Sequence, residues 1–169
     1  CNLRCGYCFA DSGAYHGQRS LMSLETGKKA LDFLIKASEH RKHIEVDFFG
    51  GEPLLNFEVC KELVKYGKEQ AAQHGKVFKF TMTTNGVLLT KEVQEFLNEE
   101  GISAVLSLDG RKETNDNMRK FPNGAGSYDA IVKNFQDFVK TRNGEEYYLR
   151  GTYTHHNTDF ADDVAHMVD

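Results

Sequence analysis

Two kinds of hydrophobic pattern alternate along the chain. Apolar residues recur at every second position in four short runs, and longer runs between them repeat apolar residues at helical spacing. The short runs predict strands at residues 44–49, 77–85, 102–109 and 147–154. The longer runs predict helices at residues 24–39, 56–74, 90–99 and 127–142, and one that begins near residue 159. Strands separated by helices of this length indicate βαβ units, and therefore a parallel sheet.

Residues with known end preferences mark the boundaries of these helices. Ser23 and Thr90 lie where N-caps belong, and Gly75 and Gly101 lie where C-caps belong. Residues 110–126 form the longest connection without a predicted element. A loop of this length is more typical of a functional segment than of a simple link.

Polar side chains gather at the C-terminal ends of the predicted strands. Alternate residues of a strand share a face, and the polar faces of the four strands lead to Asp47, Asn85, Asp109 and Thr154. In a barrel of parallel strands, this end carries the active site. We therefore predict an α/β fold, a partial (β/α)6 TIM-like barrel with outer helices whose first and last strands lie outside this chain. An open, doubly wound sheet with a shallow cleft is the alternative.

Composition narrows the class of protein. The chain has 169 residues, enough for one domain, and its net charge of −4 provides no general electrostatic basis for binding nucleic acid. No apolar run approaches the roughly 18 residues of a membrane-spanning helix, so we expect no membrane partner. The chain begins at Cys1, inside what looks like a motif. We therefore expect residues 1–169 to be a fragment of a longer protein.

Three of the four cysteines, Cys1, Cys5 and Cys8, lie close together at the start of the chain. Such spacing lets one loop place three thiolates around a single metal centre, and both iron–sulfur clusters and zinc accept these ligands. A structural zinc site needs a fourth ligand, and neither Cys60 nor His16 has a suitable spacing. The pattern favours a cluster with one iron left open, and a non-catalytic zinc-binding module is the alternative from a different class. Cys60 is expected to be a buried core residue.

The stretch Cys-x3-Cys-x-Tyr-Cys at residues 1–8 resembles the signature of radical S-adenosylmethionine (SAM) enzymes. The resemblance implies that the three cysteines hold a 4Fe-4S cluster, that SAM binds its open iron, and that Tyr7 belongs to the cofactor site. It also implies that an electron from the cluster cleaves SAM to a 5′-deoxyadenosyl radical, which abstracts a hydrogen atom from the substrate.

Two further motifs resemble parts of the same family. Gly50-Gly51-Glu52-Pro53 follows a predicted strand and resembles the family's Gly-Gly-Glu motif. The resemblance implies that Gly50, Gly51 and Glu52 hold the SAM amino group. Taken alone, this motif is also an ordinary turn. Thr83-Thr84-Asn85-Gly86 ends the next strand, and the resemblance places Asn85 beside SAM.

Ser107-Leu108-Asp109-Gly110 is similar to the Ser-x-Asp-Gly of peptide-modifying members. The match implies that Ser107 touches SAM and that Asp109 points towards the substrate as a catalytic residue. Arg119 follows in a segment where relatives often have His-Asp-x-x-Arg, with the arginine near SAM. Asn115 here takes the place of the histidine, so the resemblance assigns Arg119, and not position 115, to the cofactor.

Arg150 lies on the polar face of the last predicted strand. An arginine inside a barrel needs a partner, and the carboxylate of SAM is a suitable bidentate one. The alternative is a structural ion pair with Glu52, Asp47 or Asp109.

The chain as a whole resembles SPASM-type peptide maturases, in particular the thioether-forming maturases of six-cysteine peptides (ranthipeptides), through residues 5–10, 17–23, 47–54, 107–112 and 147–151. The implied partners are a cysteine-containing precursor peptide and an electron donor such as flavodoxin or ferredoxin, and the implied location is cytoplasmic. An anaerobic sulfatase-maturing enzyme, which makes formylglycine, shares these motifs and is the close alternative. We expect the peptide-recognition domain and the auxiliary-cluster domain of such enzymes to lie outside residues 1–169.

Overall fold

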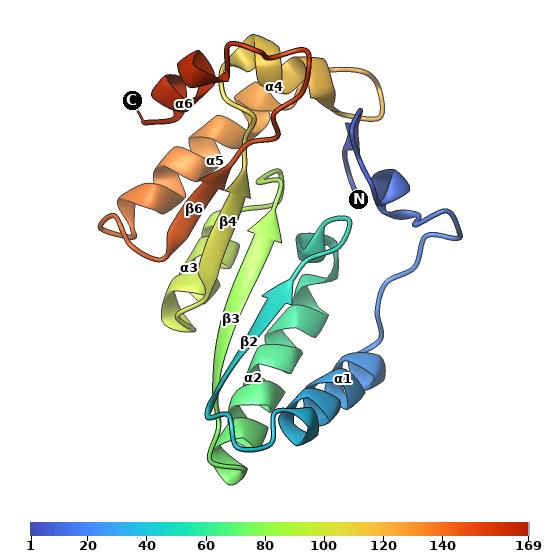
Figure 1. Ribbon diagram of the computed structural model, residues 1–169, viewed down its shortest axis with the longest axis vertical. Helices are drawn as coiled ribbons and strands as arrows, with labels where there is room; N and C mark the ends of the chain where they lie inside the picture. Colours follow the sequence, from blue (N-terminus) through green and yellow to red (C-terminus); the bar gives the residue numbers. More distant parts are fainter. Residues whose placement is uncertain (169) are drawn as a thin grey trace.

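A parallel sheet of four strands forms the centre of the structure, a computed structural model that describes residues 1–168 (Figure 1). The strands lie in the order β2 (His43–Phe48), β3 (Val77–Thr84), β4 (Ser103–Ser107) and β6 (Tyr147–Arg150). Every pairing is parallel, as βαβ units require. All four predicted strands are confirmed, although each ends slightly earlier than predicted.

The predicted helices are also confirmed. They are α1 (Leu24–Ala37), α2 (Phe57–Gln73), α3 (Lys91–Glu99), α5 (Tyr128–Lys140) and α6 (Phe160–Val168). Short 3-10 turns, η1 (Asp11–Gly13) and η2 (Pro53–Asn56), precede α1 and α2. No helix within residues 1–168 combines the length and the apolar composition needed to cross a bilayer.

Residues 110–126 are not the plain loop that the sequence predicted. They contain α4 (Lys112–Met118), which leads directly into β5 (Arg119–Lys120). The sequence of α4 is almost entirely polar, so its periodicity contains no helix signal. The Lys112 ammonium instead stabilises the helix through ion pairs with Asp116 and with Asp129 at the start of α5.

The helix ends follow the predicted chemistry. The hydroxyls of Ser23 and Thr90 each accept a hydrogen bond from the N–H three residues on, at 3.1 and 3.5 Å. Gly75 and Gly101 both have a φ of +64°, and the residue after each of them donates its N–H back to the preceding helix. This Schellman arrangement ends α2 and α3 and turns the chain into the next strand.

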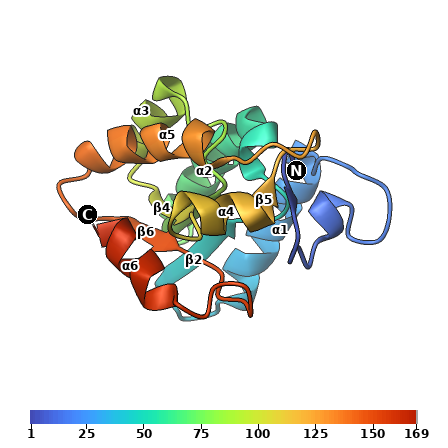
Figure 2. The same cartoon turned by 90° about the horizontal axis from the view of Figure 1, so that it is seen from above.

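Helices α1, α2, α3 and α5 cover one face of the sheet, and the opposite face is polar. Phe80, Met82 and Leu106 on the covered face are at most 3% exposed and belong to one apolar cluster with side chains of all four helices. The other face carries residues such as Thr83 and Arg150. Figure 2 shows α3 and α5 together on one side of the strands. A doubly wound sheet carries helices on both faces, so the partial barrel is the correct prediction.

A short pairing that the sequence did not predict holds the first segment of the chain. β1 (Arg4–Cys5) pairs antiparallel with β5, so that Cys5 lies opposite Arg119. The Gly6 N–H extends this pairing by donating to the Met118 carbonyl oxygen at 2.9 Å. The cysteine segment is thereby held near the C-terminal ends of the parallel strands, towards the top of Figure 1.

Gly86, in the turn after β3, offers a test of this packing. It has a φ of +80°, and a Cβ atom there would lie 2.2 Å from the Phe135 ring, whereas the Cβ position of Gly75 is open. We expect Gly75→Ala to lower the free energy of unfolding by about 1 kcal/mol through backbone strain alone. Gly86→Ala should lower it by about 3 kcal/mol, because overpacking adds to the strain. Urea unfolding measures both losses, and equal losses would contradict the contact with Phe135.

Candidate functional site

One cavity collects the residues that the sequence assigns to the cluster and to SAM. It has a volume of about 240 Å³, lies at the C-terminal ends of the parallel strands, and is named here the cysteine cavity. All predicted metal ligands and all predicted cofactor-binding residues line it; Asp109 alone does not. Its walls are formed by Cys1, Cys5, Tyr7, Cys8, Phe9, Phe49, Gly50, Gly51, Glu52, Thr83, Thr84, Asn85, Ser107, Arg119, Arg150 and Thr152.

Three free thiols border the cysteine cavity. Cys5 is part of β1, and a turn in which the Cys8 N–H donates to the Cys5 carbonyl oxygen at 3.1 Å brings Cys8 to the same cavity. The Ser12 N–H reaches the Cys8 sulfur at 3.3 Å, and burial raises the pKa of the Cys5 thiol. Soft sulfur ligands from one loop suit an iron–sulfur cluster, which is wider than a single ion.

The residues that the structure describes contain no site of the kind that the zinc alternative requires. Within residues 1–168, no three His, Cys, Asp or Glu side chains converge as they must to hold a single metal ion. Cys60, the fourth cysteine, is 5% exposed and lies in the apolar core, as predicted. It therefore supplies no further ligand beside the other three.

Gly50 and Gly51 let the turn after β2 pass close to the cysteine segment. Gly50 has a φ of +125°, and a Cβ atom on Gly51 would lie 3.1 Å from the main-chain nitrogen of Cys1. Without side chains, these two residues bring their backbone to the wall of the cavity.

Glu52 is 6% exposed, and its carboxylate ties the turn after β2 to the end of β3. Its Oε1 accepts hydrogen bonds from the Thr84 hydroxyl (2.8 Å) and the Leu54 N–H (3.1 Å), and its Oε2 accepts one from the Asn85 N–H (2.8 Å). Burial raises the pKa of the Glu52 carboxyl, and these hydrogen bonds oppose the rise. Most of the acceptor capacity of this side chain is therefore used inside the protein.

Asn85 connects the sheet to the cysteine segment. Its side-chain amide donates to the Asn2 side-chain oxygen at 2.7 Å and to the Cys1 sulfur at 3.8 Å. Its own side-chain oxygen accepts the Val87 N–H at 3.1 Å, which closes the turn after β3. The contacts of Asn85 thus place it beside the first of the predicted cluster ligands.

Tyr7, Asp109 and Arg119 form a buried chain of hydrogen bonds. The Arg119 guanidinium donates to the Tyr7 hydroxyl oxygen at 2.7 Å, and the Tyr7 hydroxyl donates to Asp109 Oδ2 at 2.6 Å. The Thr152 N–H donates to Asp109 Oδ1 at 3.0 Å. Asp109 is 2% exposed and Arg119 is 7% exposed, and within the described residues Arg119 Nε has no hydrogen-bond partner. Burial raises the pKa of Asp109, while Arg119 and Tyr7 oppose that rise.

Ser107 and Arg150 are paired across β4 and β6, and both line the cysteine cavity. The exposed Arg150 guanidinium lies 5.9 Å from the centre of the Phe49 ring. Phe49 stacks in turn on Phe9, with ring centres 5.9 Å apart, so aromatic rings edge this side of the cavity. Within the described residues, Arg150 has no carboxylate oxygen at ion-pair distance, although its charge opposes the rise that burial causes in the pKa of Asp47. The role of Arg150 stays a prediction.

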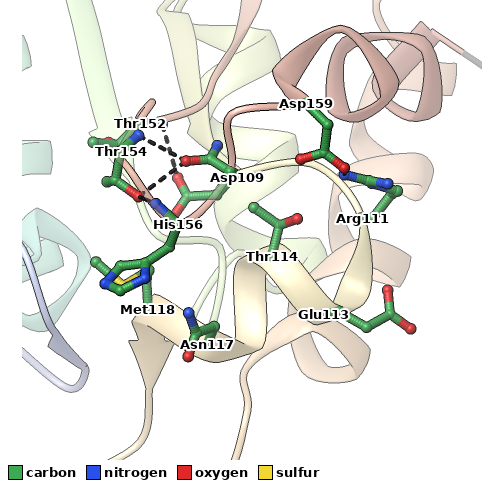
Figure 3. A pocket seen from close by; sticks show the side chains of 11 residues that line it. Asp109, Arg111, Glu113, Thr114, Asn117, Met118, Thr152, Thr154, His156 and Asp159 are labelled. Carbon is green, nitrogen blue, oxygen red and sulfur yellow. Dashed lines mark hydrogen bonds and ion pairs between the residues drawn. The ribbon is translucent and has the colours of Figure 1, made fainter.

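A second, polar cavity of about 460 Å³ borders Asp109 and is named here the polar cavity. Figure 3 shows the side chains around it, which come from the β4–α4 turn, α4 and the segment after β6. Arg111 lines it and forms ion pairs with Asp159 (2.6 Å) and with the buried Asp163 (2.8 Å). Thr152 lines both cavities, so Asp109 and Thr152 lie between them. The catalytic role of Asp109 stays a prediction.

Several residues of the site were not predicted from the sequence, among them the aromatic residues Phe9 and Phe49 that edge the cavity and three polar residues. Thr84, Asn2 and Thr152 each form a hydrogen bond to a side chain that was predicted. Thr152 could have been found, because it shares the polar face of its segment with Arg150. Thr84 has the strand parity of core residues, and Asn2 lies in no predicted element, so pattern alone carries no signal for them.

Comparison with known proteins identifies the family. A model of the 4Fe-4S single cluster domain matches residues 1–133. The cysteine-type anaerobic sulfatase-maturating enzyme of Clostridium novyi is 30% identical over 143 residues, which are 80% of this chain and 37% of that protein. The radical SAM cyclopropyl synthase TigE of Paramaledivibacter caminithermalis is 25% identical over 96% of this chain and 36% of its own length.

Solved structures extend the likeness to the fold. The structure of native anSMEcpe with bound AdoMet and Kp18Cys peptide matches 98% of this chain with a TM-score of 0.83 and 25% identity, and the match covers 44% of that protein. This chain therefore spans less than half the length of the relatives it matches. Because the family model covers more than half of the chain, the chain belongs to the 4Fe-4S single cluster domain family, and its relatives place it in the radical SAM family.

Proposed function

We propose that residues 1–169 form the SAM-cleaving core of a radical SAM enzyme that modifies a peptide. The observation that carries the proposal is the cysteine cavity, where three thiols, a glycine turn and a buried arginine meet at the C-terminal end of a parallel sheet. Cys1, Cys5 and Cys8 would hold the 4Fe-4S cluster, and the polar residues of the same cavity would hold SAM. Thiols kept for such a cluster need a reducing compartment, which favours the cytoplasm.

When bound, these cofactors supply a 5′-deoxyadenosyl radical that removes a hydrogen atom from the substrate, with an electron from a donor such as flavodoxin or ferredoxin. The residues of the chain position SAM for this chemistry. Arg119 offers a buried guanidinium, and Ser107 offers a hydroxyl at the end of β4. Both suit the SAM carboxylate, because hydrogen bonds to a charged group are strongest where water is excluded.

The glycine turn is suited to the amino end of SAM. The backbone of Gly50 and Gly51 can approach an ammonium group closely because no side chain intervenes. Glu52 contributes mainly by holding this turn against β3, since three donors already occupy its carboxylate. Tyr7 and Asn85 hold the cysteine segment at the same cavity, and they would border SAM on that side.

Two aromatic rings edge the cysteine cavity beside Arg150. The stacked rings of Phe9 and Phe49 form an apolar edge, and Arg150 lies over Phe49. Arg150 is exposed and has a free guanidinium in the described structure, so it can turn towards an anionic group of SAM.

We infer that the substrate is a cysteine-containing precursor peptide in which the enzyme forms a thioether cross-link. The five stretches of sequence that resemble ranthipeptide maturases support this reaction. One hydrogen atom of a peptide carbon would pass to the 5′-deoxyadenosyl radical, the cysteine thiol would lose its proton to solvent, and the remaining electron would pass to an auxiliary iron–sulfur cluster as the carbon–sulfur bond forms. The peptide would then have lost two hydrogens and kept its sulfur.

Formation of formylglycine in a sulfatase is the second candidate reaction. It is supported by the 30% identity to the sulfatase-maturating enzyme of Clostridium novyi and by the TM-score of 0.83 to anSMEcpe. Both reactions begin with hydrogen abstraction from a peptide, so the same cofactor cavity can serve either of them.

Cys5→Ala in the full-length protein should abolish cluster binding, because one of three thiolate ligands is lost. Cys60→Ala is the matched control, since Cys60 is buried in the apolar core and its thiol donates only to the Pro53 carbonyl oxygen, at 3.8 Å. Iron and sulfide analysis after anaerobic reconstitution measures the result. Full iron content in Cys5→Ala, or bound zinc in place of iron in the unchanged protein, would contradict the cluster assignment.

The reduced, reconstituted full-length enzyme should release 5′-deoxyadenosine from SAM, and the mass of the peptide product should then distinguish the two reactions. A synthetic peptide with six cysteines and a sulfatase-derived peptide with one cysteine serve as substrates. Loss of two hydrogens with all sulfur retained in the first peptide supports thioether formation, whereas loss of sulfur from the second supports formylglycine. An enzyme that binds SAM and releases no 5′-deoxyadenosine would contradict the catalytic proposal.

A further inference from the structure

Asp109 has few of the properties of a group that reacts with a substrate. Its carboxylate is buried, and its two oxygens are already occupied by separate donors, the Tyr7 hydroxyl at 2.6 Å and the Thr152 N–H at 3.0 Å. Arg119 lies next in the chain of hydrogen bonds and donates to the Tyr7 oxygen at 2.7 Å. Asp109 does not line the cysteine cavity, but its two hydrogen-bond donors Tyr7 and Thr152 do. Of these two, Tyr7 is the one that also accepts a hydrogen bond from Arg119, so Asp109 reaches Arg119 through Tyr7.

The protonation chemistry of the three groups sets the direction of these bonds. A carboxylate can only accept, so the Tyr7 hydroxyl must donate its single proton to Asp109. The lone pairs of the Tyr7 oxygen are then turned towards Arg119, and a guanidinium can only donate. The bond from Tyr7 to Asp109 thus orients the Tyr7 oxygen, and that oxygen in turn orients the Arg119 guanidinium through one of its terminal nitrogens. The Nε of Arg119 has no hydrogen-bond partner within the described residues.

We propose that Asp109 is a positioning residue that acts through Tyr7 to orient Arg119 towards the anionic end of SAM. The inference rests on the proposed function, because Arg119 is taken there as a ligand of SAM. It differs from the catalytic role that the sequence suggested for Asp109, in which the carboxylate itself faces the substrate.

Asp109→Asn keeps the size of the side chain but disrupts the direction of the hydrogen bonds that run from Arg119 through Tyr7 to Asp109. An asparagine offers one acceptor oxygen to two donors, the Tyr7 hydroxyl and the Thr152 N–H, so its NH2 group must face one of them. Tyr7→Phe removes the bridging hydroxyl and leaves the aromatic ring in place. Both variants should release Arg119 from its fixed orientation while the three cysteines stay unchanged.

The test measures SAM affinity in the reconstituted full-length enzyme, by titration of SAM against the EPR spectrum of the reduced cluster. This readout does not require turnover, and iron content is measured on the same samples. We expect Asp109→Asn and Tyr7→Phe each to weaken SAM binding by roughly ten- to a hundred-fold, the range for loss of a hydrogen bond to a charged group. Iron content should equal that of the unchanged enzyme, and the KM for SAM should rise more than kcat falls.

The double variant tests whether the two residues act in series. If Asp109 acts only through Tyr7, then Asp109→Asn in the Tyr7→Phe background should weaken SAM binding by less than about two-fold further. Fully additive losses would overturn the proposal, because they would mean that Asp109 and Tyr7 act on SAM independently.

Two matched controls separate positioning from general damage to the fold. Asp163→Asn alters another buried aspartate, which binds Arg111 beside the polar cavity, and Tyr66→Phe removes a hydroxyl that donates to Asp32 at the surface. Both should bind SAM as the unchanged enzyme does.

Each remaining outcome has a distinct meaning. Loss of iron from both Asp109→Asn and Tyr7→Phe would overturn the proposal in favour of a structural role in holding the cysteine segment. Full iron content with unchanged SAM affinity would also overturn it. If Asp109→Asn fails to fold, Tyr7→Phe alone decides between these results. Failure of the unchanged enzyme to bind SAM would instead refute the proposed function.

Discussion

The cysteine segment has almost no regular structure of its own, and its attachment to the sheet through buried polar bonds is the constraint on which the site depends. Asn85 binds Asn2, 83 positions away along the chain, and Tyr7 binds Asp109, 102 positions away. The two-residue pairing of β1 with β5 adds a third connection. Ordering a loop costs conformational entropy that these few bonds must offset. The conformation of the loop therefore depends on the strands that carry its partners.

The two faces of the same strands have opposite chemical character. On one face, their side chains pack with four helices into the apolar core, and on the other they carry the groups that hold the site. Glu52 and Asp109 are buried at the boundary, where an unpaired carboxylate would be strongly destabilising. Each is stabilised by donors from more than one segment of chain, so the two carboxylates that help to build the site also join the segments that form it.

The regular elements were predictable because their patterns are local. The alternation in the strands and the caps at Ser23, Thr90, Gly75 and Gly101 depend on residues a few positions apart, and all were confirmed. The polar helix α4 and the β1–β5 pairing were missed because neither has a hydrophobic period.

At the site, the motifs predicted which residues meet, but not how they bind one another. The sequence contains no sign that Tyr7 lies between Asp109 and Arg119, or that Arg111 pairs with Asp163, 52 positions away. Such contacts depend on where separate loops end in space. Pattern within one element cannot carry that information, and the position of Arg150 over the Phe49 ring was not predictable for the same reason.

Tyr7 separates Asp109 from Arg119, which leaves more of the guanidinium donors available than a direct ion pair would. The closest approach of Arg119 to Asp109 is 4.0 Å, too long for a hydrogen bond. A bidentate pair at this position would occupy two of the five donors of the guanidinium and neutralise its charge locally. With Tyr7 interposed, Asp109 still balances the buried positive charge, and only one Arg119 nitrogen is occupied by the bridge. Because Tyr7 also lies between Cys5 and Cys8 in the sequence, the arrangement links the orientation of the arginine directly to the segment that carries the thiols.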